Sequence, residues 1–429
     1  MRLTLVADNA TSPNWGCRAT SFALREILSS RHEIVGTISR SLLSAPLTSR
    51  ARLSPAAYEK LVRAFRRPRV ARVPVLGPMA ISAIDAVGTY HVPSHDVRTD
   101  AGLLWSLQSA SPKARAIVSE IECCDAIVVN GEGEMIFSTP ARETLLQTLA
   151  ICVLAKRMGK SIFYVNAMVS KPTAGETNHE TAKVASGVLA RARVAVRDPR
   201  SADMASAFLP EIETCLVPDA LFTWSRHFRD QAAAPYDQSR LRAWFDRTGQ
   251  TLPTVTKRPY IVLSGSSHSA IDQQRAAQSY CGLAKALRGL GLPVLLVETC
   301  IGDVFLRSVA REMQLPILRV DTPIMAGAAI MAHARLFVSG RWHPGIMASL
   351  GGTPSVTMGS NSHKTLALQE ILQYADPVEY SAFPDAADAE AITAAGKALL
   401  DEGEDRRLAI AARAADLASE VPQLLELIA

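Results

Sequence analysis

The sequence predicts an α/β protein made of two Rossmann-like domains that face each other across a cleft. Short apolar runs alternate with segments of helical periodicity, which is typical of βαβ units and a mainly parallel sheet. The alternation stops once, in a polar stretch at 225–259 that contains three prolines, and then begins again. At 429 residues the chain is long enough for two or three domains with cores of their own.

Residues 1–224 are expected to form the N-terminal domain. Its first strand, 3–7, leads through a turn-rich loop into a helix at 18–28, which places Phe22, Leu24 and Leu28 on one side. The other elements expected in this domain are strands at 33–38, 126–129, 161–165, 193–196 and 214–217, helices at 103–121, 141–158, 180–190 and 201–208, and an amphipathic segment near 55–65.

Residues 260–429 are expected to form the C-terminal domain, and 225–259 the linker, with a short helix at 239–245. The second domain repeats the strand–helix alternation and is closed by two helical segments. Its expected elements are strands at 260–263, 293–297, 317–320, 336–338 and 355–357, helices at 273–290, 303–313, 323–334, 344–350 and 365–374, and closing helices at 387–400 and 405–428.

The net charge of +5 is concentrated in one place. Residues 50–72 contain eight basic residues and one acid, so the rest of the chain is slightly acidic. This basic insertion, at about 45–75, is either a solvated surface or a patch for an anionic partner, such as lipid headgroups at a membrane surface or a phosphate-linked acceptor. Aromatic residues make up only 6%, which argues against a base-stacking nucleic-acid groove.

The seven cysteines are scattered and form no C-x-x-C pair, so neither a disulfide framework nor a zinc site is expected. They are typical of reduced thiols in a cytoplasmic protein. The N-terminus reads as a first strand and not as a signal peptide, and no 18 apolar residues run together. We therefore expect a cytoplasmic protein, with peripheral contact at the inner membrane face as an option.

Ligands in open parallel sheets bind beyond the carboxyl ends of the strands, so the loops after the strands are the places to look for chemistry. The first such loop contains Asn14 and Gly16 and opens a helix. A glycine before a helix N-terminus lets backbone N–H groups approach an anion. A plain tight turn would explain this loop equally well, and no G-x-G-x-x-G motif indicates a dinucleotide cofactor.

The second loop, Asn130-Gly131-Glu132-Gly133-Glu134, follows a buried strand. Two glycines around an acid make a sharp turn. A carboxylate placed there either serves the turn, binds sugar hydroxyls or acts as a base.

Two further loops follow neighbouring strands. Arg197 ends one strand and is expected to point into the cleft, where its guanidinium suits carboxylates and phosphates; pairing with Asp198 or Asp219 is the alternative. Asp219 ends the next strand, where it either caps the following helix or contributes a carboxylate to the site.

The most informative loop runs from Ser339 through Gly340 and Arg341 to His343 and opens a helix at Pro344. One turn thus brings together a hydroxyl, a guanidinium, an imidazole and free helix-start N–H groups. This combination can bind a doubly charged anion and offer a proton near neutral pH. No H-E-x-x-H or related motif is present, so no catalytic metal is implied.

Together these loops resemble the polysaccharide pyruvyl transferase family over nearly the whole chain. The most specific part is the block 340–348 with Gly352-Thr353-Pro354; Val196-Arg197-Asp198 and Pro218-Asp219 add to it. The resemblance implies a glycosyltransferase-B-like fold with the acceptor on the N-terminal side and the donor on the C-terminal side. Two departures stand out: the family often has three consecutive glycines at 131–133, and often an acid where Cys17 stands.

The resemblance also implies a reaction. The donor would be phosphoenolpyruvate, and the acceptor two hydroxyls of a saccharide, or of its lipid-linked precursor, which become a pyruvate ketal. Arg197 and Arg341 would hold the donor's carboxylate and phosphate, and His343 would be the general acid. Three carboxylates remain open as the base, and Lys364 would either add charge to the donor site or lie on the surface. The three carboxylates are Glu132, Glu134 and Asp219.

Two alternatives come from the same architecture, because a fold does not fix a function. One is a glycosyltransferase that uses a nucleotide sugar; the helix after Arg341 shows no clear glutamate to hold a ribose. The other is a non-catalytic homologue that binds a sugar or a phosphate, which the intact Arg341 and His343 argue against.

Overall fold

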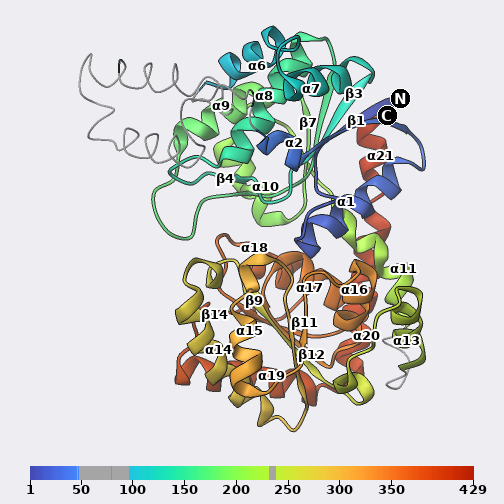
Figure 1. Ribbon diagram of the computed structural model, residues 1–429, viewed down its shortest axis with the longest axis vertical. Helices are drawn as coiled ribbons and strands as arrows, with labels where there is room; N and C mark the ends of the chain where they lie inside the picture. The colour runs from blue at the N-terminus through green and yellow to red at the C-terminus, as the bar shows by residue number, and fades with distance from the viewer. Residues whose placement is uncertain (46, 48–78, 80–95, 231–237) are drawn as a thin grey trace.

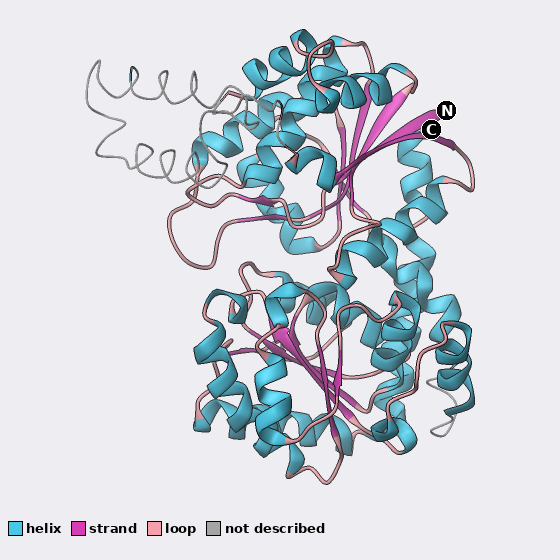
Figure 2. Ribbon diagram, viewed as in Figure 1, coloured by secondary structure: helices cyan, strands magenta, loops and turns pink. Residues whose placement is uncertain are grey.

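The computed structural model describes residues 1–45, 47, 79, 96–230 and 238–429. The chain forms two α/β lobes, one above the other in Figure 1, and each is a twisted sheet between helices (Figure 2). The basic residues at 50–72 and the amphipathic segment near 55–65 lie outside the described residues.

The first sheet has six parallel strands in the order β2-β1-β3-β5-β7-β8. Side chains alternate between two cores: Leu3 and Leu5 of β1 face one, and Val6 faces the other. Both faces are therefore buried, as expected of parallel strands with helices on each side. The strands are β1 (Arg2–Asp8), β2 (Glu33–Ser39), β3 (Ala126–Asn130), β5 (Ser161–Ala167), β7 (Arg193–Val196) and β8 (Thr214–Leu216), and a small parallel pair is formed by β4 (Met135–Ile136) and β6 (Val169–Ser170).

The expected helix at 103–121 is wrong, because two helices occupy this region. Helix α6 ends at Ser106, and α7 begins at Pro112. The Ser111 hydroxyl accepts a hydrogen bond from the Ala114 N–H, and proline suits the first helical position, so a new helix starts there. The helices of this lobe are α1 (Trp15–Leu28), α2 (Arg40–Ser44), α6 (Val97–Ser106), α7 (Pro112–Glu122), α8 (Glu143–Arg157), α9 (His179–Leu189) and α10 (Pro199–Phe208).

The second sheet also has six parallel strands, in the order β11-β10-β9-β12-β13-β14, which is the strand order of a doubly wound Rossmann sheet. The edge strand β14 was not predicted, since it is two residues long and half-buried. The strands are β9 (Ile261–Ser266), β10 (Val294–Val297), β11 (Ile317–Leu318), β12 (Leu336–Gly340), β13 (Ser355–Met358) and β14 (Glu379–Tyr380); the helices between them are α14 (Gln273–Arg288), α15 (Leu306–Met313), α16 (Ile324–His333), α17 (Trp342–Ser349) and α18 (Lys364–Ile371).

The connection between the sheets contains η1 (Ala220–Trp224), α11 (Ser225–Phe228), α13 (Gln238–Arg247) and η2 (Thr254–Lys257). The chain closes with α19 (Ala386–Asp401), α20 (Gly403–Glu420) and α21 (Gln423–Ile428), so the single helix expected at 405–428 is divided at Pro422. Helix α21 lies beside the first lobe, near the N-terminus (Figure 1). Leu424, Leu425 and Ile428 of this helix are buried in the core that also contains Leu3 and Leu28, and Glu426 pairs with Arg31 at 2.6 Å on the exposed surface.

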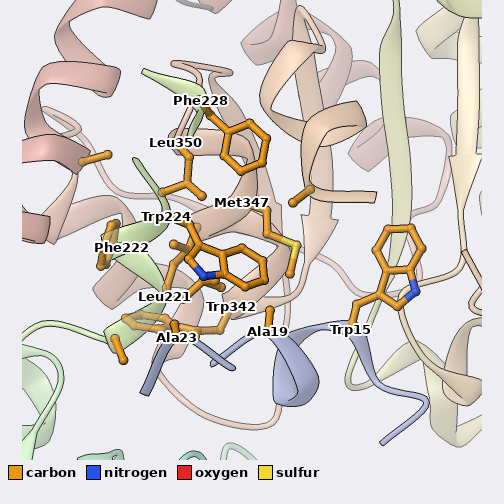
Figure 3. Packing of buried hydrophobic residues seen from close by; sticks show 14 of the residues in the cluster. Trp15, Ala19, Ala23, Leu221, Phe222, Trp224, Phe228, Trp342, Met347 and Leu350 are labelled. Atoms are coloured by element: carbon orange, nitrogen blue, oxygen red, sulfur yellow. The ribbon is translucent and has the colours of Figure 1, made fainter. Parts of the chain in front are cut away.

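The two lobes share a hydrophobic core at their junction (Figure 3). The Trp15 indole N–H donates to the Val320 carbonyl at 2.8 Å, and its ring lies where a side chain on Gly327 would be. Because of this packing, the carboxyl-terminal ends of the strands of one sheet face those of the other. Side chains labelled in Figure 3 are Trp15, Ala19, Ala23, Leu221, Phe222, Trp224, Phe228, Trp342, Met347 and Leu350. Among the described helices, none is long and apolar enough to cross a membrane.

Candidate functional site

A cavity of about 370 Å³ lies between the lobes, where the loops that follow the strands of both sheets meet. Eight of the residues proposed from the sequence line it: Asn14, Glu132, Gly133, Glu134, Arg197, Arg341, His343 and Lys364. Six do not line it: Gly16, Asn130, Gly131, Asp219, Ser339 and Gly340. Further lining residues include Asn9, Cys17, Arg40, Arg142, Ser267, Thr299 and Asn361.

Helix α1 starts at the edge of this cavity. The Asn14 side chain caps it by accepting a hydrogen bond from the Cys17 N–H, at 3.3 Å. Gly16 lies against the imidazole of His343: a Cβ at this position would be 2.6 Å from Nδ1. Gly16 therefore contributes by its missing side chain, which lets the first turn of α1 approach His343.

The glycine-rich loop after β3 contributes two carboxylates to the cavity wall, Glu132 and Glu134. Glu132 adopts a positive φ of 38°. Its Oε1 accepts hydrogen bonds from the amides of Asn9, at 2.7 Å, and Asn130, at 3.0 Å. Gly131 packs on Tyr164, whose ring would lie 2.4 Å from an added Cβ. Asn130 and Gly131 thus support Glu132 from behind.

Glu134, two residues further along, is buried, and two arginines balance its negative charge. Its carboxylate contacts Arg40 and Thr144 and lies 3.4 Å from Arg142. Burial alone would raise the pKa of Glu134, but Arg142 and Arg40 outweigh it, so the pKa lies below its usual range. This carboxylate stays ionised and tied to two arginines.

Asp219 is fully buried and connects both lobes to His343. Its Oδ2 lies 3.2 Å from Arg197 Nη1 and 3.2 Å from His343 Nε2, and accepts the Trp342 indole N–H at 3.0 Å. Its Oδ1 accepts from the Thr20 hydroxyl at 2.9 Å. Although burial opposes it, the proximity of His343 and Arg197 holds the pKa of Asp219 well below its usual range.

Arg197 and Arg341 enter the cavity from opposite lobes. The Arg197 guanidinium lies over the Trp342 ring, 4.4 Å from its centroid, and its Nε has no partner among the described residues. Arg341 Nη2 pairs with Asp303 Oδ1 at 2.5 Å, and the Arg341 Nε is likewise unpartnered within the described chain. Both guanidiniums retain donors for a ligand.

The loop before Arg341 shapes the site without lining it. The Ser339 hydroxyl donates to the Gly265 carbonyl at 2.7 Å, and a Cβ on Gly340 would lie 2.3 Å from Ser266 Cβ. Helix α17 starts at Trp342, two residues earlier than expected, with Arg341 at its N-cap. His343 is therefore in the first helical turn.

Lys364, the first residue of α18, is part of the cavity wall and not a surface lysine. Its amine donates a hydrogen bond to Asn361 Oδ1 at 2.7 Å. Sequence reasoning missed Arg40 and Arg142. Arg40 directly follows β2, so the strand-end rule that found Arg197 could have found it; Arg142 precedes α8 and carries no such signal.

Within the described residues, no group of three or more histidine, cysteine, aspartate or glutamate side chains is arranged to hold a metal ion. The lining contains four arginines and a lysine but only two carboxylates, Glu132 and Glu134. The cavity therefore suits a ligand with more than one negative charge.

Solved structures of low sequence identity share this architecture. The UDP-GlcNAc 2-epimerase of Neisseria meningitidis, solved with UDP-GlcNAc, matches with a TM-score of 0.53 at 9% identity, over 100% of this chain and 99% of that one. Anabaena Alr3699/HepE, solved with UDP and glucose, gives 0.49 at 12% identity, over 100% and 97%. The chain has the glycosyltransferase-B arrangement of two Rossmann-like domains.

No curated protein matches the sequence significantly. A family model does: polysaccharide pyruvyl transferase matches residues 16–362, which include the loops of Arg197, Asp219, Arg341 and His343. The chain belongs to the polysaccharide pyruvyl transferase family.

Proposed function

We propose that this protein transfers the enolpyruvyl group of phosphoenolpyruvate to a saccharide, forming a pyruvate ketal and releasing phosphate. The observation that carries the proposal is the meeting of Arg197 and Arg341, one from each lobe, beside His343 in one cavity. Phosphoenolpyruvate bears a carboxylate and a phosphate, and two guanidiniums with free N–H donors match these groups.

The reaction needs a proton on the methylene carbon, which becomes the methyl group. His343 is the proposed donor. Asp219 lies 3.2 Å from its Nε2, which leaves Nδ1 as the nitrogen that delivers the proton. One acceptor hydroxyl then bonds to C2 and gives its proton to the base, which passes it to the phosphate as the C2–O bond to phosphate breaks. The second hydroxyl bonds to C2, which completes the ketal, and its proton returns the imidazole to the protonated form.

The proposed base is Glu132. It lines the cavity, where it accepts hydrogen bonds from the amides of Asn9 and Asn130 and lies beside the Cys17 thiol. Arg40 is near enough to interact with it, but the described ion pair of Arg40 is with Glu134. Glu134 and Asp219 are poorly suited as bases, because neighbouring cations lower the pKa of each carboxylate and so make it a weaker proton acceptor. We assign Asp219 a positioning role: it orients His343, Arg197 and Trp342 together.

The proposed acceptor is a glycan or its lipid-linked precursor. The basic stretch at 50–72 would then attract the phosphate groups of such an acceptor, or an anionic membrane surface. This role is separate from the chemistry in the cavity.

The test is to incubate the purified protein with phosphoenolpyruvate and candidate saccharides, and to measure released phosphate together with the product mass. We expect one phosphate per pyruvate ketal formed. Glycosyl transfer from a nucleotide sugar, without dependence on phosphoenolpyruvate, would replace this proposal by the glycosyltransferase alternative. Saturable phosphoenolpyruvate binding without turnover on any saccharide would favour a binding homologue.

A further inference from the structure

Lys364 differs from the arginines that line the cavity, because its hydrogen-bond partner is neutral. The four lining arginines each have a carboxylate: Arg40 and Arg142 share Glu134, Arg197 pairs with Asp219, and Arg341 with Asp303. Lys364 hydrogen-bonds to the neutral amide of Asn361, and among the described residues no carboxylate forms an ion pair with it. Its amine is the one lining cation, in the described chain, that is left without a counter-ion.

The surroundings of Lys364 disfavour a positive charge. Burial lowers its pKa most, and Arg341, Arg197 and Arg142 lower it further, to about 7. Cys17 acts in the opposite, raising direction. His268, in the loop after β9, is also near the amine: burial lowers the pKa of this imidazole most, Lys364 lowers it further, and Glu379 acts in the opposite direction.

The Asn361 contact fixes where the amine lies. Asn361 Oδ1 also contacts the Ser267 hydroxyl, at 3.2 Å, and the Asn361 N–H donates to that hydroxyl at 3.1 Å. Asn361 and Ser267 both line the cavity. The amine is therefore held at the wall by Asn361, which accepts its hydrogen bond but carries no charge, and Ser267 holds Asn361 in place.

We propose that Lys364 is largely a neutral amine in the ligand-free cavity at pH 8 and gains a proton when the phosphate-bearing donor binds. The proposal rests on the proposed function for the identity of the donor. A bound phosphate and carboxylate supply the negative charge that the site lacks, and they favour the ammonium form. Binding would then take one proton from solvent, and the new ammonium would hold the phosphate until it leaves.

The experiment is calorimetric titration of the whole protein with phosphoenolpyruvate at pH 8, in buffers of different ionisation enthalpy. At this pH the donor's phosphate is already fully ionised, so a buffer-dependent heat reports protons taken up by the protein. We expect about one proton per donor bound in the wild type. Inorganic phosphate, titrated in the same way, separates the contribution of the phosphate group from that of the carboxylate.

Two variants distinguish Lys364 from its neighbours. Lys364→Met should lose the proton uptake and bind the donor at least tenfold more weakly. Lys364→Arg carries a fixed positive charge, so this variant should bind the donor without taking up a proton. It provides the same test if Lys364→Met folds poorly. His343→Gln is the matched control and should retain the uptake.

The outcomes separate the two proposals. The role of Lys364 is overturned if the donor binds without a buffer-dependent heat, or if Lys364→Met takes up as many protons as the wild type. Either result leaves the proposed function standing. If the proton uptake disappears in His343→Gln, the role proposed for Lys364 is also overturned, and the group that takes up the proton is the His343 imidazole. If phosphoenolpyruvate does not bind the wild type at all, the proposed donor itself is wrong.

Discussion

Arg197 and Arg341 come from different lobes, yet both keep an unpartnered Nε within the described structure and reach one cavity. Carboxylates behind them, Asp219 and Asp303, hold the guanidiniums in place rather than occupying them fully. Such an arrangement pre-positions charge for an anion, so that little side-chain freedom is lost on binding.

Removing one guanidinium should therefore weaken use of the donor. We expect Arg341→Ala to reduce kcat/KM for phosphoenolpyruvate roughly 10–150-fold, since a charge-assisted hydrogen bond contributes about 1.5–3 kcal/mol. Steady-state kinetics with varied donor measure this. Arg226→Ala is the control, because that arginine pairs with Glu26 on the exposed surface; equal effects in both variants would refute a donor-binding role.

His343 has a different expected signature. Replacing it with glutamine keeps the size of the side chain but removes the acid, so turnover should fall by about two to four orders of magnitude. The dissociation constant for phosphoenolpyruvate, measured by titration, should change only a few-fold. A variant that binds weakly yet turns over normally at saturation would make His343 a binding residue.

At the scale of the element, the site depends on how closely helix α1 approaches α17. In Gly16→Ala the new methyl group would lie 2.6 Å from His343 Nδ1, so the imidazole must move. Because a shift of about 1 Å at a catalytic group can cost on the order of 100-fold in rate, we expect kcat to fall by 10–100-fold with the fold intact.

The matched control for this prediction is Gly187→Ala in α9. That glycine is exposed and has open space around it, so alanine should be neutral or slightly stabilising. Rates and thermal unfolding of both variants should be compared. Unchanged kcat in Gly16→Ala would show that His343 tolerates displacement and that its position is not critical.

The elements also show what a sequence can and cannot predict. Most strands were predictable because runs such as residues 126–129 are apolar throughout, as both faces of the sheet are covered. The break before Pro112 was missed although the sequence carries its signal, because a serine followed by a proline is typical of a helix start. Strand β14 carries no apolar signal, and it exists because β13 offers an open edge.

The candidate site followed from one rule, that ligands bind beyond the carboxyl ends of parallel strands. The rule identified Arg197, Glu132 and Arg341 on the cavity wall. It could not show that Asp219 turns inward, because that depends on Trp342 and His343 from the other lobe. Nor could it separate Lys364 from surface lysines, since nothing in the local sequence shows that the start of α18 forms part of the cavity wall.

At the scale of the whole molecule, the two lobes are held together on both sides of the cavity. The core around Trp15 joins them on one side, and Arg200 of α10 forms a two-pronged pair with Glu370 of α18 on the other. His363 adds a contact with Asp198 at 3.2 Å. The cavity therefore lies in a junction to which both lobes contribute.

The basic stretch at 50–72 is expected to bind an anionic partner, and this prediction is separate from the chemistry of the cavity. Neutralising Arg63, Arg66, Arg67 and Arg69 together should reduce binding to vesicles that contain anionic lipid, or to a pyrophosphate-linked acceptor. Turnover on a small uncharged saccharide should remain within about twofold, because the stretch lies outside the loops 130–134, 197–198, 218–219 and 339–345 to which the chemistry is assigned. Vesicle sedimentation and kinetics measure the two effects; wild-type behaviour in both would leave the stretch a solvated surface.

The central claim is that the cavity protonates the methylene carbon of phosphoenolpyruvate and joins C2 to saccharide oxygens. The most direct measurement is the reaction in D₂O with a saccharide acceptor, followed by NMR and mass spectrometry of the product. The account predicts a pyruvate ketal whose methyl group carries one deuterium, and no such product with His343→Gln on the same time scale. A product that retains the enol double bond, or one that carries a sugar instead of a ketal, would contradict it.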